Sequence, residues 1–193
     1  MRACKTCTLV IISLLLTGCG NSIWDLARWG KTDEVRATLE RDASTLNARN
    51  ELEKTPLFFS VTFDQPEVTT LLLDKGADIA ARDRTGLTAL HAAAWMNRDI
   101  QAGLLLERGA EIDAQDNFGD TALHVAAYRE RPQIYVYLLK RGANPDAKNK
   151  AGLSPMELAQ KSLAPDRFSK FQTAVNELLA ESAGVTGVAS PTP

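Results

Sequence analysis

Apolar and polar positions along this chain recur with a fixed step of 33 residues. The repeated pattern is a leucine pair followed three residues later by a glycine: Leu72-Leu73 with Gly76, Leu105-Leu106 with Gly109, and Leu138-Leu139 with Gly142. A helix commonly ends with a left-handed glycine just after its last apolar residues, so each pattern indicates a helix end. Self-similarity at this period is typical of repeat architectures. The chain is therefore predicted to be a stack of helical units.

Each period also predicts a shorter helix, which comes first in the unit. The sequence Thr-Ala-Leu-His begins two of these helices and Thr-Pro-Leu-Phe a third, at residues 88–91, 121–124 and 55–58. One such helix runs from about Thr88 to Met96 and follows a hairpin tip. Proline suits a first helical residue, and prolines share the register where the second helix would begin, at Pro66, Pro132 and Pro165. One helix pair cannot bury its apolar face alone, so neighbouring units must stack.

These motifs resemble the ankyrin-repeat family, whose units keep the same spacing. The resemblance implies an all-α repeat solenoid of about five stacked helix-turn-helix units joined by β-hairpin-like loops, over residues 22–180. The central three units are complete, and the outer two are atypical, as capping units should be. In the second unit Phe58 replaces the histidine and Glu53 the tip glycine, so we expect a bent or mobile hairpin there. In the fifth unit Glu157 takes the histidine position, and a longer helix runs through Val175.

Two histidines, His91 and His124, are the first candidates for chemistry. The resemblance implies that each ties its helix to the neighbouring hairpin by hydrogen bonds, and that the glycines at 76, 109 and 142 are structural. Stacked helices lie roughly 8 to 10 Å apart, so two histidines in one register cannot both reach a zinc ion at ~2.1 Å. The sequence contains no phosphate-binding loop, His-Glu-x-x-His helix or nucleophile elbow. We therefore expect no enzyme activity, no metal and no cofactor.

The first nineteen residues have the pattern of an export signal. Two basic residues precede an apolar run over residues 9–16, which is about half the ~20 residues that a membrane-spanning helix needs. The following Leu-Thr-Gly-Cys, ending at Cys19, resembles the lipobox of bacterial lipoproteins. This resemblance implies a signal peptide over residues 1–18, acylation of Cys19 and a short tether over residues 19–21. A buried helix of the first repeat is the alternative, but the residues from Ser22 onward already supply that helix.

The positions of the cysteines agree with this interpretation, because Cys4 and Cys7 would be removed with the signal peptide. The mature chain would keep only Cys19, in acylated form, which suits an oxidising periplasm. Several acyl chains together make a durable membrane anchor. Residue 20 is Gly, not the Asp that tends to retain lipoproteins in the inner membrane of enteric-like bacteria, so we expect the outer membrane, facing the periplasm. A cytosolic adaptor is the alternative if the lipobox pattern is accidental.

Charge and composition narrow the class of partner. The formal net charge is −2, and a mildly acidic chain without a basic stripe argues against nucleic-acid binding. The last residues, 181–193, are small and polar and have no apolar periodicity. We expect them to form a disordered tail, to which the sequence assigns no role.

Ankyrin proteins generally recognise other proteins through the hairpin tips and the exposed end of the short helix. Carried over by register, the candidate partner-binding residues are Phe63, Trp95, Met96, Phe118, Tyr128, Arg84, Asp120 and Arg129. Aromatic residues, Met and Arg are enriched in interface cores, where truncating one can cost ~2 kcal/mol or more. The alternative is that some of these side chains pack against the next hairpin or shield a seam between repeats. Binding through the convex side is a further alternative.

Together these observations favour a lipid-anchored adaptor in the bacterial cell envelope that is monomeric when unbound and binds one protein non-covalently. Two versions fit the residues equally. One is an immunity protein that blocks a toxin at the membrane, and the other is a scaffold or protector of an envelope enzyme. A structural envelope component without a dedicated partner is the alternative from a different class.

Overall fold

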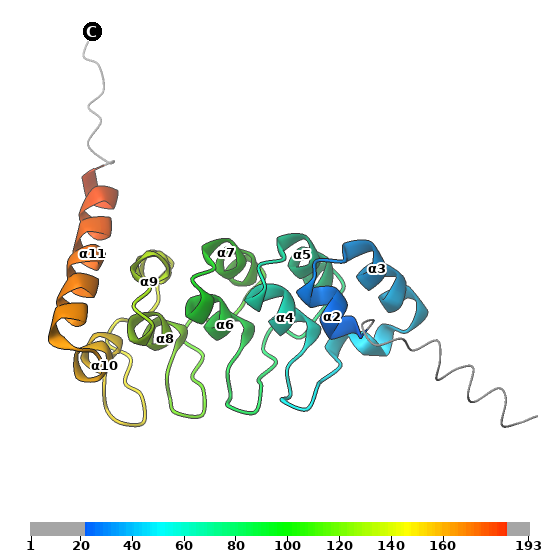
Figure 1. Cartoon of the computed structure of the whole chain (residues 1–193), viewed down its shortest axis with the longest axis horizontal. Coiled ribbons are helices and arrows are strands. Elements are labelled where there is room, and N and C mark those ends of the chain that lie inside the picture. The colour runs from blue at the N-terminus through cyan, green and yellow to red at the C-terminus, as the bar shows by residue number, and fades with distance from the viewer. Residues whose placement is uncertain (1–21, 185–193) are drawn as a thin grey trace, which may run out of the picture.

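The computed structural model describes residues 22–184 as a stack of paired helices (Figure 1). In chain order the helices are α2 (Ile23–Arg28), α3 (Thr32–Arg41), the 3-10 helix η1 (Ala43–Asn47), α4 (Pro56–Thr62), α5 (Pro66–Asp74), α6 (Ala89–Met96), α7 (Asp99–Glu107), α8 (Ala122–Tyr128), α9 (Pro132–Lys140), α10 (Pro155–Ser162) and α11 (Pro165–Gly184). No strand is present within residues 22–184. The all-α repeat stack predicted from the sequence is confirmed.

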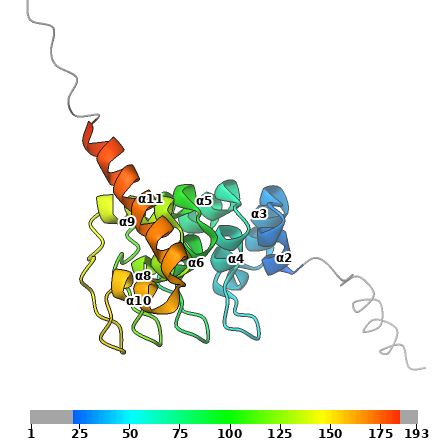
Figure 2. The ribbon, with the colours of Figure 1, turned by 60° about the vertical axis from the view of Figure 1, so that its left-hand side comes forward.

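The helices form two rows. The shorter helices α2, α4, α6, α8 and α10 make one row, and α3, α5, α7 and α9 make a second row beside it. The hairpin loops all extend from the side of the first row, as Figure 2 also shows. One face of the stack is therefore lined by hairpins and shorter helices, and the opposite face by the longer helices.

The local sequence explains where the helices begin and end. A hydroxyl residue stands immediately before each shorter helix, with a step of 33: Ser22, Thr55, Thr88, Thr121 and Ser154. Such a residue can accept a hydrogen bond from an N–H of the first turn, which stabilises the helix by ~1 kcal/mol. Helices α5, α9 and α11 begin at the prolines expected there. The glycines after α5, α7 and α9 have the left-handed φ that a helix end favours, with 83° at Gly76, 87° at Gly109 and 92° at Gly142.

The core is a continuous layer between the two rows of helices. Each central unit has one fully buried leucine in its shorter helix and one in its longer helix: Leu57 and Leu72, Leu90 and Leu105, Leu123 and Leu138. Several polar side chains are also buried, and Gln101 differs from the others in its environment. Gln101 is fully buried at the register of Val68 and Ile134, and neither polar atom of its amide has a hydrogen-bond partner among the described residues.

The four hairpins share one hydrogen-bonding scheme. In each, an Asn or Asp side chain accepts hydrogen bonds from two backbone N–H groups of its own hairpin, at Asn50, Asp83, Asp116 and Asn149. The second-unit hairpin has this same scheme and is not bent, so the prediction of a bend is wrong, while the alternative of a mobile hairpin stays a prediction. Glu53 adopts a φ of 62°, close to the 82° of Gly86. The hydrogen bonds to Asn50 hold the backbone of this hairpin in place. The hairpin therefore keeps its shape although the left-handed residue is Glu53 and not glycine, which costs about 1 kcal/mol.

Helix α11 closes the stack at its C-terminal end. Its Phe171 is buried against Tyr135 of α9, with the ring centroids 5.5 Å apart in an edge-to-face arrangement. The helix continues to Gly184, which corrects the expectation that residues 181–184 belong to a disordered tail. The sequence has no proline or glycine between Pro165 and Gly184 that would end the helix earlier.

Several predictions concern residues outside the described range. The signal peptide, the acylated Cys19 and the tail over residues 185–193 are among them. Within residues 22–184, no helix has the length and apolar character needed to cross a bilayer.

Candidate protein-binding groove

Hydrogen bonds from histidines fix two of the hairpins against the units that precede them. The Nδ1 atom of His91 accepts from the backbone N–H of Thr88 at 3.2 Å, so its Nε2–H donates to the carbonyl oxygen of Asp120 at 3.0 Å. His124 donates in the same way to the carbonyl oxygen of Leu153, also at 3.0 Å. Burial lowers the pKa of His91, which favours the neutral ring that these hydrogen bonds require. Both histidines thus make the hydrogen bonds that the resemblance implied.

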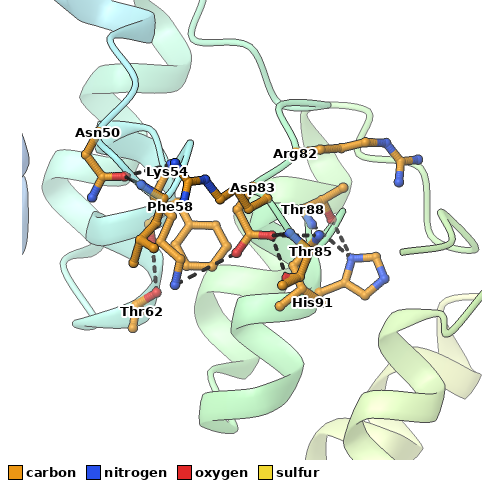
Figure 3. Close-up of polar contacts among 12 residues, drawn as sticks. Asn50, Lys54, Phe58, Thr62, Arg82, Asp83, Thr85, Thr88 and His91 are labelled. Carbon is orange, nitrogen blue, oxygen red and sulfur yellow. Dashed lines mark hydrogen bonds and ion pairs between the residues drawn. The ribbon is translucent and has the colours of Figure 1, made fainter. Parts of the chain in front are cut away.

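The second unit uses a different link to the next hairpin (Figure 3). Phe58 stands in the histidine position, and the ammonium nitrogen of Lys54 lies 4.4 Å from the centre of its ring. The same nitrogen lies 3.8 Å from a carboxylate oxygen of Asp83 in the next hairpin. A cation between an aromatic face and a carboxylate therefore takes the place of the histidine hydrogen bond.

In the fifth unit Glu157 occupies the histidine position, and the described residues contain no further hairpin beyond it. Its carboxylate accepts hydrogen bonds from the ammonium group of Lys148 at 2.7 Å and from the backbone N–H of Ser154 at 2.6 Å. These two contacts lower the pKa of Glu157 to about 2. The side chain therefore caps its own helix instead of reaching to another unit.

The hairpin tips and shorter helices of the third to fifth units enclose a groove of about 340 Å³. Its walls carry Trp95 near the end of α6, Phe118 at a hairpin tip and Tyr128 at the end of α8. Val125 and Leu158 also line it. The three aromatic side chains are 39%, 65% and 46% exposed, respectively. Partly exposed aromatic rings around one hollow have the composition of an interface core.

Contacts within the stack hold these aromatic residues in place. The backbone N–H of Phe118 donates to the carboxylate of Asp116 at 2.8 Å, and its carbonyl oxygen accepts from the N–H of Lys150 in the next hairpin at 3.0 Å. The guanidinium carbon of Arg129 lies 4.1 Å from the centre of the Trp95 ring. The groove is thus largely formed before any partner binds, which lowers the entropic cost of binding.

The structure brings together only some of the residues that the sequence predicted as partner-binding. Trp95, Phe118, Asp120 and Tyr128 line the groove, and Arg129 contacts it through the Trp95 ring. The carboxylate of Asp120 also accepts a hydrogen bond from the side chain of Asn149 at 2.7 Å. Asp120 therefore supports the hairpin as well as lining the groove.

The three other predicted residues do not line this groove. Phe63 stacks on Phe59, with centroids 6.4 Å apart, and lies under the guanidinium group of Arg28. Met96 is half-buried at the last position of α6, and Arg84 is exposed in a hairpin.

The partner-binding residues predicted from the sequence do not include five that line the groove: Thr85, Leu87, Asp116, Val125 and Leu158. Leu158 lines the groove from α10 and stands 33 residues after Val125, which lines it from α8. The repeat register could therefore have identified it, because equivalent residues of adjacent units face the same side of the stack.

The groove contains carboxylates but no arrangement typical of catalysis. Asp116 and Asp120 both accept hydrogen bonds that hold the hairpins. In the part of the chain that the structure describes, no group of three or more His, Cys, Asp or Glu side chains could hold a metal ion. Both groove carboxylates therefore have structural roles in the hairpins.

Comparison with known proteins identifies matching family models and a few distant relatives. Residues 1–116 match a family model for ankyrin repeats (3 copies), and residues 105–159 match one for ankyrin repeats (many copies). NF-kappa-B inhibitor alpha from Sus scrofa and from Homo sapiens are each 42% identical over 62 residues, which are 32% of this chain and 20% of those proteins. The Gallus gallus protein of the same name is 43% identical over 60 residues, which are 31% of this chain and 19% of that protein.

The matched segment thus spans about a fifth of the length of these relatives, so the likeness concerns the repeats and not a whole protein. Ankyrin repeats are generally modules for protein–protein interaction and are typically not enzymes. The repeated helix pairs, the hairpins and the matched family models agree with one another, and the chain belongs to the ankyrin-repeat family.

Proposed function

We propose that this chain binds one specific protein through the groove on its hairpin face. The proposal is based on the exposure of Trp95, Phe118 and Tyr128 around one hollow of about 340 Å³. Covering such rings removes apolar surface from water, which contributes about 25 cal/mol per Å². Aromatic side chains in preformed pockets are also frequent binding hot spots. The general role of ankyrin repeats as modules for protein–protein interaction supports the same function.

We further propose that the protein is a lipoprotein of the bacterial cell envelope, anchored through acylated Cys19. The support is the Leu-Thr-Gly-Cys sequence after a short apolar run. Only Gly20 and Asn21 separate this cysteine from Ser22, which caps α2. At ~3.5 Å per extended residue such a tether is on the order of 10 Å long. The repeat stack would then sit close to the lipid, on the periplasmic side of the outer membrane.

Two biological roles agree with a groove held at a membrane. An immunity protein would bind a toxin as it reaches the membrane, and a scaffold or protector would hold an envelope enzyme there. Both use the same aromatic groove, so the chemistry of the captured partner separates them. A structural component without a dedicated partner would instead associate with copies of itself.

The experiment for the groove is an affinity pull-down from envelope extract, using the full chain with Cys19→Ser as bait. The test variant adds Trp95→Ala and Phe118→Ala, and circular dichroism checks that it is folded. The matched control is Ile100→Ala on α7, because Ile100 is also apolar and 65% exposed but belongs to the row of longer helices. We expect one protein that the bait and the Ile100→Ala control retain and the double variant loses. Retention by all three would place the binding site elsewhere.

The anchor is tested separately by metabolic labelling with a fatty-acid analogue and by membrane fractionation. Wild type should carry the label and fractionate with membranes, and Cys19→Ser should lose both properties. Unchanged fractionation of the Cys19→Ser variant would contradict the lipoprotein proposal and favour a cytosolic adaptor. The groove proposal would be unaffected by that result.

A further inference from the structure

A second, polar pocket of about 540 Å³ adjoins the aromatic groove. It lies where α8 turns into α9 and α10 turns into α11. Three arginines line it, Arg129, Arg131 and Arg167, together with the hydroxyl-bearing side chains of Tyr128 and Ser162. The proposed function does not account for this concentration of hydrogen-bond donors.

The pocket has more positive than negative charge. Glu130 is the one carboxylate among its lining residues, and it accepts hydrogen bonds from Arg167 at both of its oxygens. Arg129 and Arg131 form no ion pair with any described residue. The Nε atoms of both arginines are also buried without a hydrogen-bond partner in the described part of the chain. Two guanidinium groups are therefore left without a counter-charge.

The repeat register explains why Arg131 has no carboxylate partner. One unit earlier, Arg98 pairs with Asp64 at 3.1 Å. Arg131 stands 33 residues after Arg98, but the position 33 residues after Asp64 is Asn97. A neutral amide has replaced the acid, while the arginine has been kept. Leaving a partly buried guanidinium unpaired costs stability, and a bound anion would offset that cost.

The polar pocket and the aromatic groove have one lining residue in common. Tyr128 lines both. Arg129 lines the polar pocket while its guanidinium group stacks on Trp95, a wall of the groove. A chain segment seated in the groove would therefore have Arg129 directly beside it and Arg131 in the neighbouring pocket.

We infer that the partner is recognised through an acidic peptide segment, in which a bulky apolar side chain fills the groove and a neighbouring Asp or Glu binds Arg131 and Arg129. This inference rests on the proposed function, since it names the chemistry of the partner at the same groove. The planar guanidinium fork matches a carboxylate in two parallel hydrogen bonds. Partial burial strengthens this attraction relative to a fully exposed ion pair.

The test is selection of random phage-displayed peptides on the full chain carrying Cys19→Ser. Selected peptides should combine a bulky apolar residue with a nearby Asp or Glu. The dissociation constant of one synthesised peptide is then measured by fluorescence anisotropy. Arg131→Gln should weaken binding about tenfold, because a hydrogen bond to a charged group contributes about that factor. Arg141→Gln is the matched control, since Arg141, like Arg131, forms no ion pair with a described residue, but it lies outside the pocket.

A double-mutant cycle assigns the contact. Replacing the acidic residue of the peptide by its amide should weaken binding to wild type about tenfold and have little effect on Arg131→Gln. Equal losses for the Arg131 and Arg141 variants would overturn the inference, because they would indicate unspecific charge attraction.

The selection also separates the inference from the proposed function. Peptides that are apolar without acidic residues, and that the Trp95→Ala/Phe118→Ala variant fails to bind, would overturn the acidic-segment inference and keep the groove. Absence of any peptide that depends on Trp95 and Phe118 would count against both.

Discussion

The buried amide of Gln101 gives a stability prediction that is opposite to the usual effect of a core mutation. Most core substitutions destabilise a protein, but Gln101→Ile should stabilise this one. The side chain is fully buried. Its amide carries a donor and an acceptor, and neither has a hydrogen-bond partner among the described residues. The equivalent positions in the adjacent units carry Val68 and Ile134, both fully buried.

The expected gain is about 2 kcal/mol. Each buried polar group without a partner costs about 1 to 3 kcal/mol relative to its hydrated state in the unfolded chain. Part of the gain is lost because isoleucine has a different shape from glutamine, and imperfect packing in a core typically costs about 1 kcal/mol or more. Gln101→Met is a second variant, because methionine keeps the unbranched shape of glutamine without its amide. Both variants should be more stable than wild type.

The assay is urea unfolding followed by circular dichroism and tryptophan fluorescence, and coincident transitions would support two-state behaviour. The midpoint should rise while the slope with urea stays unchanged, because the surface exposed on unfolding is nearly the same. The reciprocal control is Ile134→Gln, which should destabilise the protein by about 3 kcal/mol. Neutral or destabilising effects of both Gln101→Ile and Gln101→Met would refute the reasoning and indicate that the amide has a partner in solution.

Two further predictions test the hairpins and the terminal unit. Gly119→Ala should destabilise the protein at least about 1 kcal/mol more than Gly152→Ala does, as measured by urea unfolding. Both glycines have a positive φ, but of the two only Gly119 would place a Cβ 2.7 Å from a backbone nitrogen, that of Lys150. Equal losses of stability for the two variants would contradict this. Glu157→Gln should lower the melting temperature at pH 7, and its difference from wild type should shrink as pH falls from about 5 towards 2. The folded pKa of Glu157 is about 2, below its unfolded value, so its stabilisation is lost on protonation; a pH-independent difference would contradict that reasoning.

The helices were predictable from the repeat, because a step of 33 residues gives the positions of the capping residues and of the first-turn prolines in every unit. It predicted less where neighbouring units differ. Glu53 keeps a left-handed conformation because Asn50 holds the hairpin, and a missing glycine alone does not reveal that support. Helix α11 extends to Gly184 because no helix breaker precedes it, whereas polar composition suggested a tail.

The candidate groove was predictable only in part, because its residues also depend on contacts that differ between units. Register predicted that Trp95, Phe118 and Tyr128 lie on the hairpin face, and all three line the groove there. It could not predict that Phe63 would lie under Arg28, because Arg28 belongs to the atypical first unit. Contacts between a regular unit and a capping unit depend on side-chain geometry that the period does not specify.

The most direct test of the proposed binding groove is site-specific photocrosslinking in cells with the full chain. A benzoyl-phenylalanine crosslinker replaces Phe118 in the groove, and in a second strain it replaces Ile100 on α7. We predict one crosslinked protein, different from this chain, at position 118 and not at position 100. Crosslinking at both positions alike, or only between copies of the chain itself, would contradict a dedicated partner in the groove.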